Sequence, residues 1–242
     1  MYAFNQLESD DPLLETSPVM RALDFLRLQF HNNPSGILLT KSKALRRATV
    51  AEAISEIQWP KWTEKEIYHG FMPKKVADEY HFEPFSILHH VLLDMKLIRN
   101  YRGRLMLSKS GAAMFVDRFS LFDYVVRGLV FDAPYFEVSR INGDLMGTWD
   151  IWLNVLDAEA QYGISGKSLT ETLYGPREDD GPFDPRTSRL YDGVLRPLVW
   201  TGLLNENTDL GRMLSDRTYT VTPLWKRYLR LDLKTPHLRV VH

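Results

Sequence analysis

Two stretches of the chain repeat the same order of hydrophobic and polar positions. Residues 88–116 start with apolar residues at helical spacing, pass through two short alternating runs around Arg102-Gly103, and return to helical spacing. Residues 190–229 carry a looser copy. A helix, a two-stranded ribbon and another helix form the second half of a winged-helix domain. The pattern therefore predicts a mainly α protein with small β-ribbons (α+β), built as tandem winged-helix domains with an N-terminal bracing helix.

The predicted organisation has an N-terminal arm and helix at 1–35 and winged-helix domains at 36–132 and 144–233. Ser17-Pro18 starts the first helix, which places Val19, Leu23, Leu26 and Phe30 along one side. Residues 36–40 read as an edge strand. Residues 132–143, which contain proline, asparagine and glycine, are the expected boundary between the domains.

Helix starts in the first domain are predicted from capping boxes, Thr49 with Glu52 and Thr63 with Glu66. Pro84 opens a helix over 85–96 whose apolar residues should face the core. Strands are expected at 97–101 and 104–108. They are followed by a helix that Ser108 or Ser110 caps and that runs to about 118, and by a second helix over 121–131. On the helix over 85–96, the expected outward residues are Ser86, His89, His90 and Asp94.

The second domain is expected to begin with a helix over 148–162. Ser168 with Glu171 predicts a capping box for a short helix to 174. Asp184-Pro185 starts the third helix, to about 201, and Pro197 should kink it because proline lacks an amide and crowds the preceding turn. Ribbon strands follow at 203–205 and 218–221, Thr222-Pro223 starts a final helix, and the tail from 234 is expected to be irregular.

Composition narrows the classes of function. The 242 residues contain no cysteine, which excludes disulfides, cysteine-ligated zinc and thiol catalysis. The start of the chain is acidic and has no secretion signal, and no apolar run is long enough to cross a bilayer. We expect a cytoplasmic protein without a membrane partner.

Charge is unevenly distributed along the chain although the net charge is only −1. The net charge is +5 over 36–118, −7 over 119–182 and +4 over 183–242. The segments that carry the ribbons are thus basic, as expected of a polyanion-binding protein. Docking of acidic segments on basic ones would give the same distribution.

The first candidate site is the helix after Pro185. Arg186, Arg189 and Arg196 share about a quarter of its circumference, and the third helix of a winged helix enters the major groove, where arginine can bind guanine or phosphate. Alternatively, this face pairs with the acidic residues 178–180. The other candidate nucleic-acid-binding residues are Lys41, Lys43, Arg46, Arg47, Arg99, Arg102, Arg104, Lys109, Arg212 and Arg217.

No motif for catalysis, a cofactor or a metal is recognisable. A phosphate loop, a Gly-x-Ser-x-Gly elbow and a His-Glu-x-x-His helix are all missing from the sequence. The adjacent His89 and His90 would point about 100° apart on a helix and cannot easily share an ion. We therefore expect a non-enzymatic protein with no cofactor and no metal.

The segments GILLTKSKALRRATVAEAISEI and LHHVLLDMKLIRNYRGRLMLSKSGAAMFVDRFSLFDYVV resemble a C-terminal region of the Ri-plasmid ORF-three-like bacterial proteins. The resemblance covers residues 36–126. It implies a bacterial or mobile-element origin and supplies no catalytic residues.

These observations favour a protein that binds double-stranded DNA, such as a regulator or maintenance factor of plasmid, phage or bacterial origin. A protein-interaction scaffold of tandem winged-helix type is the alternative. An inhibitor that binds a protein partner, mimicking DNA through residues 119–182, is a third. A homodimer is left open.

Overall fold

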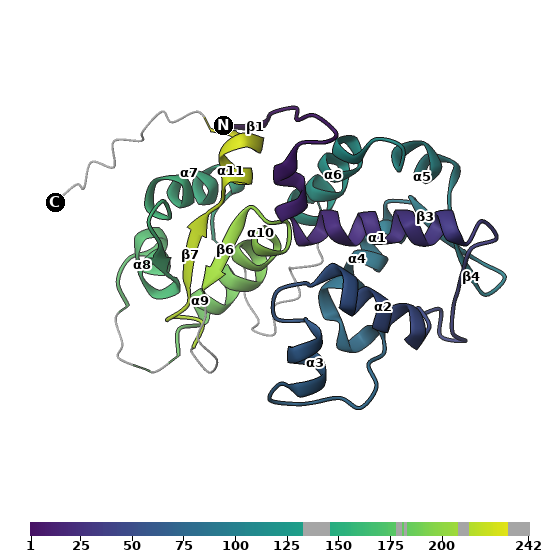
Figure 1. Cartoon of the computed structure of the whole chain (residues 1–242). Coiled ribbons are helices and arrows are strands. Elements are labelled where there is room, and N and C mark those ends of the chain that lie inside the picture. The colour runs from purple at the N-terminus through teal and green to yellow at the C-terminus, as the bar shows by residue number, and fades with distance from the viewer. Residues whose placement is uncertain (133–145, 178–180, 182, 208–212, 232–242) are drawn as a thin grey trace.

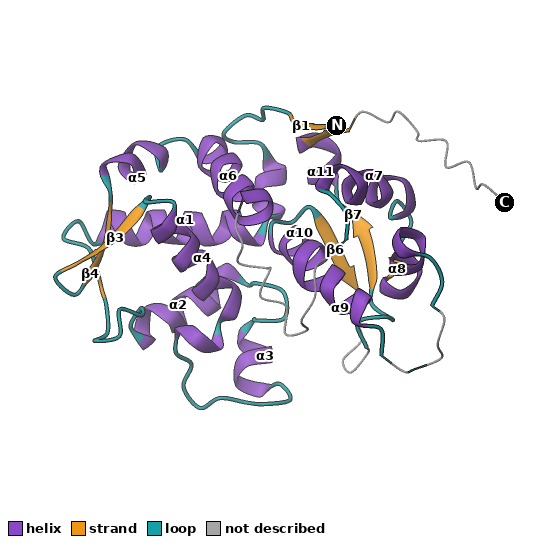
Figure 2. Ribbon diagram, turned by 180° about the vertical axis from the view of Figure 1, so that it is seen from behind, coloured by secondary structure: helices purple, strands orange, loops and turns teal. Residues whose placement is uncertain are grey.

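The computed structural model describes residues 1–132, 146–177, 181, 183–207 and 213–231. It consists of helices with three small antiparallel sheets, as expected for the α+β class. Two units follow one another and lie side by side, the N-terminal unit around the long helix α1 and the C-terminal unit around β6 and β7 (Figure 1; seen from behind in Figure 2). Several predictions fall on residues outside the described ones: the domain boundary at 133–143, the acidic residues 178–180, the candidate Arg212 and the tail from 234.

The N-terminal unit runs from α1 to β4. Its elements are α1 (Pro18–Asn32), β2 (Ile37–Leu38), α2 (Arg47–Ile57), α3 (Glu64–His69), the 3₁₀ turn η2 (Glu79–His81), α4 (Glu83–Asp94), β3 (Ile98–Tyr101) and β4 (Arg104–Leu107). The strands form an antiparallel sheet in the order β2-β4-β3. The predicted edge strand and ribbon are confirmed. The turn between β3 and β4 has positive φ at Arg102 and at Gly103, as a two-residue hairpin loop requires.

The C-terminal unit repeats this order from α7 to β7. Its elements are α7 (Trp149–Glu159), β5 (Ile164–Ser165), α8 (Gly166–Tyr174), α9 (Pro185–Leu190), the π-helical turn η5 (Tyr191–Leu195), α10 (Arg196–Trp200), β6 (Leu204–Asn207) and β7 (Thr218–Val221). Its sheet order, β5-β7-β6, matches that of the N-terminal unit. The short strand before the second helix therefore joins the far strand of the ribbon in both units.

Further elements lie outside these two repeats, and several of them join the units. They are β1 (Tyr2–Phe4), η1 (Pro12–Thr16), α5 (Lys109–Met114), α6 (Arg118–Arg127), the π-helical turn η3 (Gly128–Asp132), α11 (Pro223–Tyr228) and β8 (Leu229–Leu231). Strand β1 pairs antiparallel with β8, so the start of the chain is anchored to the C-terminal unit. The Tyr228 hydroxyl donates to Asp123 on α6 at 2.7 Å. Sequence patterns did not predict β1, η1 or β8.

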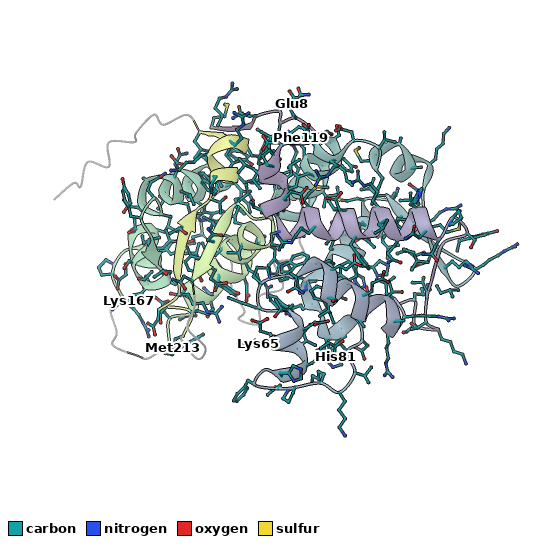
Figure 3. All side chains as sticks on the ribbon, in the orientation of Figure 1. Glu8, Lys65, His81, Phe119, Lys167 and Met213 are labelled. Atoms are coloured by element: carbon teal, nitrogen blue, oxygen red, sulfur yellow. The ribbon has the colours of Figure 1, made fainter. Side chains whose placement is uncertain are left out.

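One continuous hydrophobic core extends through both units. The four predicted core residues of α1 are all buried, and the ring of Phe25 packs edge-on against that of Phe85 on α4 at 5.9 Å. Trp59, which follows α2, meets Trp200 at the end of α10 at 6.1 Å. The side chains in Figure 3 fill the space between the two groups of helices. Aromatic contacts therefore join the units as well as filling them.

Several predicted helix ends are wrong. Helix α2 starts at Arg47, before Thr49, and its N-cap residue Arg46 makes no side-chain cap. Helix α8 starts after Ser165, whose hydroxyl accepts from the Ser168 amide at 3.0 Å, so Ser168 is not the cap. The box of Thr63 with Glu66 is confirmed.

Two further differences concern helices near the ribbons. The helix after Ser108 ends at Met114, because Asp117 caps a new helix by accepting from the Ser120 amide at 2.6 Å. Near Pro197 the expected distortion is a π-helical turn in which the Arg196 amide bonds to the Tyr191 carbonyl. The wider turn accommodates a ring that would crowd the previous turn of an α-helix.

Among the described residues, none of the helices combines the length and the hydrophobicity that crossing a membrane requires. Within the same part of the chain, the histidine and acidic side chains nowhere form a group of three or more that could hold a metal ion.

Candidate nucleic-acid interface

Backbone hydrogen bonds place the loop after β2 beside the turn of the β3–β4 ribbon. Leu38 pairs with Arg104, and the Leu39 amide donates to the Gly103 carbonyl at 2.9 Å. The loop then folds back on itself, because the Thr40 amide donates to the Ala44 carbonyl at 2.8 Å. Residues 41–47 and 99–102, far apart in sequence, therefore lie together.

This arrangement gathers six exposed cationic residues, which we call the ribbon–loop surface: Lys41, Lys43, Arg46, Arg47, Arg99 and Arg102. Within the described residues, no ion pair neutralises any of them. The guanidinium groups of Arg99 and Arg102 lie 5.2 and 5.1 Å from the ring centre of Tyr101. Tyr101 is exposed and was not predicted as a site residue. Its position between two arginines near the turn is the sequence feature that could have indicated it.

Two of these cations occupy backbone conformations that other residues adopt more easily. Lys43 has φ +67° and Arg102 has φ +47°. A side chain in the left-handed region costs of order 1 kcal/mol, and glycine or asparagine is usual at such positions. Long cationic side chains are thus held at turn positions despite their backbone strain.

The N-terminus of α2 adds a further positive group to the ribbon–loop surface. Because no side chain caps it, its first amides are left to solvent or to a ligand, and the helix dipole adds partial positive charge there. Arg46 and Arg47 are exposed beside these amides. Helix start and basic side chains together form a site suited to phosphate.

A buried pair fixes the loop to the body of the unit. Glu79 accepts from the Leu45 amide and from His89 Nδ1, both at 2.5 Å. His89 is therefore buried, which corrects the prediction that it faces outward with Ser86, His90 and Asp94. No sequence signal linked Glu79 to His89 or to Leu45, since the contact depends on how η2 docks on α4.

Two predicted residues of the N-terminal unit lie outside this surface. Arg104 is partly buried and donates to the Gly36 carbonyl at 3.0 Å and to Ser35 at 3.2 Å, so it braces β2. Lys109 is exposed at the start of α5, at the opposite end of the ribbon from the turn.

The three arginines that were predicted to share a face of the helix after Pro185 are engaged within the protein. Arg186 forms an ion pair with Asp184 at 2.9 Å and donates to the Gly175 carbonyl at 3.3 Å. Arg189 is partly buried. The side chain of Arg196 is only 18% exposed and pairs with Asp192 at 3.4 Å and with Glu83 at 3.6 Å. The shared helical face therefore turns towards α4 and the chain's own carboxylates.

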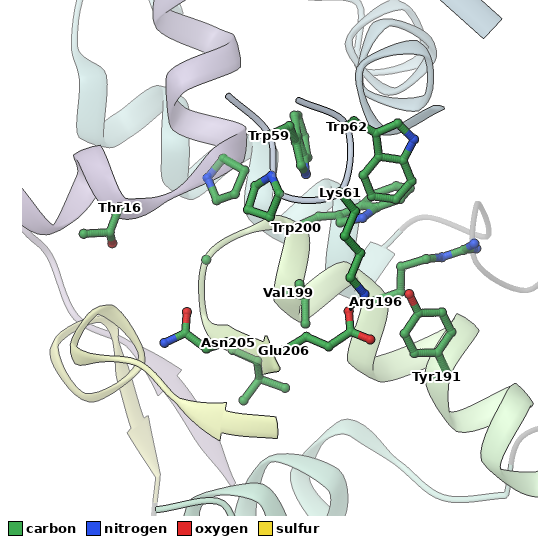
Figure 4. Close-up of a pocket in the computed structure, with 14 residues that line it drawn as sticks. Thr16, Trp59, Lys61, Trp62, Tyr191, Arg196, Val199, Trp200, Asn205 and Glu206 are labelled. Atoms are coloured by element: carbon green, nitrogen blue, oxygen red, sulfur yellow. Dashed lines mark hydrogen bonds and ion pairs between the residues drawn. The ribbon is translucent and has the colours of Figure 1, made fainter. Parts of the chain in front are cut away.

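Arg217 belongs to a cluster at the junction of the units, of which Figure 4 shows Lys61, Tyr191 and Glu206. It donates to Glu206 at 2.9 Å, and Lys61 donates to the other oxygen of the same carboxylate. Glu206, on β6, is almost fully buried, with 2% of its side chain exposed. Burial, assisted by the Glu206 charge, raises the pKa of the neighbouring Tyr191 to about 12.

Stability should therefore fall as pH rises from about 10 to about 12. An unfolded tyrosine ionises near pH 10, whereas folded Tyr191 keeps its proton until about pH 12. In this window the unfolded state releases its proton first, which favours unfolding by up to about 1.4 kcal/mol per pH unit. Urea denaturation at a series of pH values measures the slope. Tyr191→Phe should make the slope shallower, although buried Tyr219 and Tyr228, whose pKa values are also raised, still contribute to it. Tyr162→Phe, at a fully exposed position, should leave the slope unchanged, and equal slopes for all three proteins would contradict the assignment.

Comparison with known proteins finds similarity to two domain families that follow one another along the chain. The Y4jL N-terminal domain matches residues 15–120 and the y4jL C-terminal domain matches residues 139–223. A protein of Sinorhizobium fredii (strain NBRC 101917 / NGR234), described as the uncharacterized protein y4jL, is 23% identical over 203 residues, covering 81% of this chain and 90% of its own length. No solved structure matches significantly.

These matches correct the resemblance drawn from the sequence patterns. The segments at 36–126 belong to a longer two-domain arrangement that extends to residue 223, and not to the Ri-plasmid ORF-three-like proteins. Over most of its length the chain is therefore similar to the y4jL protein, with both domains matched in the same order.

Proposed function

We propose that the chain is a non-enzymatic, tandem winged-helix protein that binds double-stranded DNA through the ribbon–loop surface of its N-terminal unit. The order helix, short strand, helix, helix, ribbon and the sheet orders β2-β4-β3 and β5-β7-β6 support the winged-helix assignment. In such a domain the β3–β4 ribbon is the wing, and the wing and the start of the second helix approach the DNA backbone.

The observation that carries the proposal is the gathering of six exposed cations around one turn and one uncapped helix start. Phosphate groups along a duplex present closely spaced negative charges, and lysine, arginine and free backbone amides are the groups that bind them. The backbone strain at Lys43 and Arg102 supports a role for the side chains themselves.

Binding should depend mainly on the phosphate backbone and only weakly on base sequence. Helix α4 occupies the position of the recognition helix, and the exposed residues on it are His90 and Asp94. It contains no lysine or arginine, so the strongest contacts to guanine are missing from it. Arg186, Arg196 and Arg217 of the C-terminal unit pair with carboxylates, so we assign DNA binding to the N-terminal unit alone.

Charge reversal on the ribbon–loop surface should nearly abolish binding. In a fluorescence anisotropy titration of a mixed-sequence 20-base-pair duplex at low salt, the triple variant Lys41→Glu, Arg46→Glu, Arg99→Glu should bind about 100-fold more weakly than the native protein, because three phosphate contacts are lost and repulsion is added. These three residues have ordinary backbone conformations, so the fold should persist.

The matched control changes three exposed cations elsewhere, Lys167→Glu, Lys226→Glu and Arg230→Glu. It has the same net charge as the test variant but should bind within about threefold of the native protein. Equal loss in both variants would mean that only net charge matters. No binding by the native protein at low salt would remove the proposal.

A protein-interaction scaffold remains the second candidate because of one loop. Between α3 and η2, Phe71, Met72 and Val76 are 96%, 72% and 53% exposed, and Tyr80 is 84% exposed. Apolar side chains gathered in this way mark contact sites. Purification from a native host would distinguish the candidates: a companion protein retained by the native chain and lost with Phe71→Ser and Met72→Ser would favour the scaffold.

A further inference from the structure

The loop between α3 and η2, which we call the lysine loop (residues 70–76), presents apolar and basic side chains to solvent. Phe71, Met72 and Val76 are exposed, and so are Lys74 and Lys75. Within the described part of the chain, neither lysine forms an ion pair. Aromatic residues and methionine are enriched at protein interfaces, and monomeric proteins rarely gather exposed apolar side chains in one place. The lysine loop therefore suits contact with another protein surface.

Both ends of the lysine loop are anchored to the N-terminal unit. Ile67 on α3 is buried, and its carbonyl accepts from the Lys74 amide at 3.0 Å. Ala77, directly after the loop, is buried as well. A segment that is already held in place loses less conformational freedom when it binds, which lowers the cost of association. The projecting side chains can thus meet a partner with little rearrangement of the backbone.

Helix α7 presents the opposite charge around a second apolar stripe, which we call the α7 face. Because successive residues of a helix are about 100° apart, Ile151, Val155 and Ala158 lie within about 60° of one another. Ile151 and Ala158 are exposed, and Val155 is partly buried. The same spacing places Asp150 and Glu159, both exposed, on opposite sides of this stripe. The helix contains three acidic residues and no lysine or arginine.

The two surfaces complement each other but lie apart in one chain. The lysine loop has an apolar tip beside two cations, and the α7 face has an apolar stripe between two anions. Helix α3 belongs to the N-terminal unit, and α7 lies on the side of the C-terminal unit away from α3 (Figures 1 and 2). Complementary patches at different places on one molecule make a heterologous contact between copies.

We propose that the protein associates with itself head to tail, with the lysine loop of one copy docked on the α7 face of another. The apolar tip covers the stripe, and the two lysines lie near its flanking carboxylates. Contacts of this size are at the small end of specific interfaces, so the association is weak and is strongest at low salt. The inference gives the loop of the scaffold candidate a definite partner and does not depend on DNA binding.

Sedimentation velocity of the full chain, without DNA, measures this association. For a dissociation constant of about 10 to 500 µM, a concentration series over that range at low salt should show a sedimentation coefficient that rises with concentration. Addition of about 0.5 M salt should weaken the association, because screening reduces the attraction between the opposite charges.

Two variants each remove one surface. The loop variant is Phe71→Ser, Lys74→Glu, Lys75→Glu, and the helix variant is Asp150→Lys, Glu159→Lys. All five residues are exposed, so both variants should keep the native circular dichroism spectrum. Each variant alone should associate at least tenfold more weakly than the native chain, because apolar contact or charge attraction is lost and repulsion replaces it.

An equal mixture of the two variants gives the decisive readout. Each variant retains the surface that the other lacks, except that the changed charges stay on the unused surfaces. The mixture should therefore form one-to-one pairs with the native affinity, and these pairs should not grow further. Damage to the fold cannot produce such pairing. A symmetric dimer through either surface alone would leave one of the two variants associating by itself, which would overturn the proposal.

The matched control Lys41→Glu, Lys109→Glu changes the net charge as much as the loop variant, at two exposed positions of the same unit. It should leave the association unchanged, and equal weakening would indicate a general charge effect and overturn the proposal. A native chain that stays monomeric throughout the concentration series would overturn it too, even if the lysine loop retained a different protein. Failure of the two variants to pair when mixed would have the same meaning.

Discussion

Replacing Glu206 by alanine is expected to lower the free energy of unfolding by about 3 kcal/mol. The carboxylate is 2% exposed and compensates two cations from different units, Lys61 and Arg217. Removing it leaves both charges partly desolvated and without their acceptor, and an uncompensated buried charge is among the most destabilising changes a protein can undergo. Urea denaturation followed by circular dichroism measures the change.

Glu171→Ala is the matched control for Glu206→Ala. Glu171 pairs with Lys167 at 3.8 Å, and both side chains are exposed, so the loss should stay below about 0.5 kcal/mol. In Glu206→Ala, adding Lys61→Met should restore part of the stability by removing one of the stranded charges. A loss under about 1 kcal/mol for Glu206→Ala would show that the cluster does not hold the units together.

Gly202→Ala should destabilise the protein by about 3 kcal/mol, for two separable reasons. Gly202 has φ +79°, a conformation that costs a side-chain-bearing residue of order 1 kcal/mol. Its added Cβ would also lie 2.8 Å from the Cα atom of Ser17, the buried cap of α1, where the backbone cannot easily move. The substitution therefore forces the N-terminal and C-terminal units apart.

Gly103→Ala separates the two contributions. Gly103 has φ +74°, close to the +79° of Gly202, but an added Cβ meets nothing within 4 Å. Its loss should be about 1 kcal/mol, from backbone strain alone. Thermal and urea denaturation of the two variants give the difference, which measures the packing of α1 against the end of α10. Equal losses in both would show that the close approach to Ser17 is not a constraint.

The features that were predicted correctly from the sequence depend on residues that lie close together along the chain. The ribbon turn at Arg102-Gly103 and the caps at Ser17, Ser108, Asp184 and Thr222 depend on residues a few positions apart, and the structure has all of them. The pairing of β1 with β8 joins the two ends of the chain, and no short pattern encodes it. The same holds for the contact of Lys61 with Glu206.

The candidate site was predicted only in part, because contacts between distant segments decide which of its residues are exposed. Helical spacing placed Arg186 and Arg196 on one face, but only the docking of the units decides that Arg196 meets Glu83. The prediction of a capping box at Thr49 and Glu52 took no account of Glu79. That carboxylate holds the preceding loop by accepting from the Leu45 amide. Helix α2 begins at Arg47, before Thr49, and has no side-chain cap.

The salt dependence of duplex binding tests the central claim most directly. If the ribbon–loop surface contacts about five phosphates, the logarithm of the association constant should fall against the logarithm of salt concentration with a slope of about −4 to −5. The variant Lys41→Glu, Arg46→Glu, Arg99→Glu should have a slope shallower by about 2 to 3, and the control reversal at Lys167, Lys226 and Arg230 should keep the native slope. A native slope near zero, or one that the three reversals on the ribbon–loop surface leave unchanged, would contradict the account.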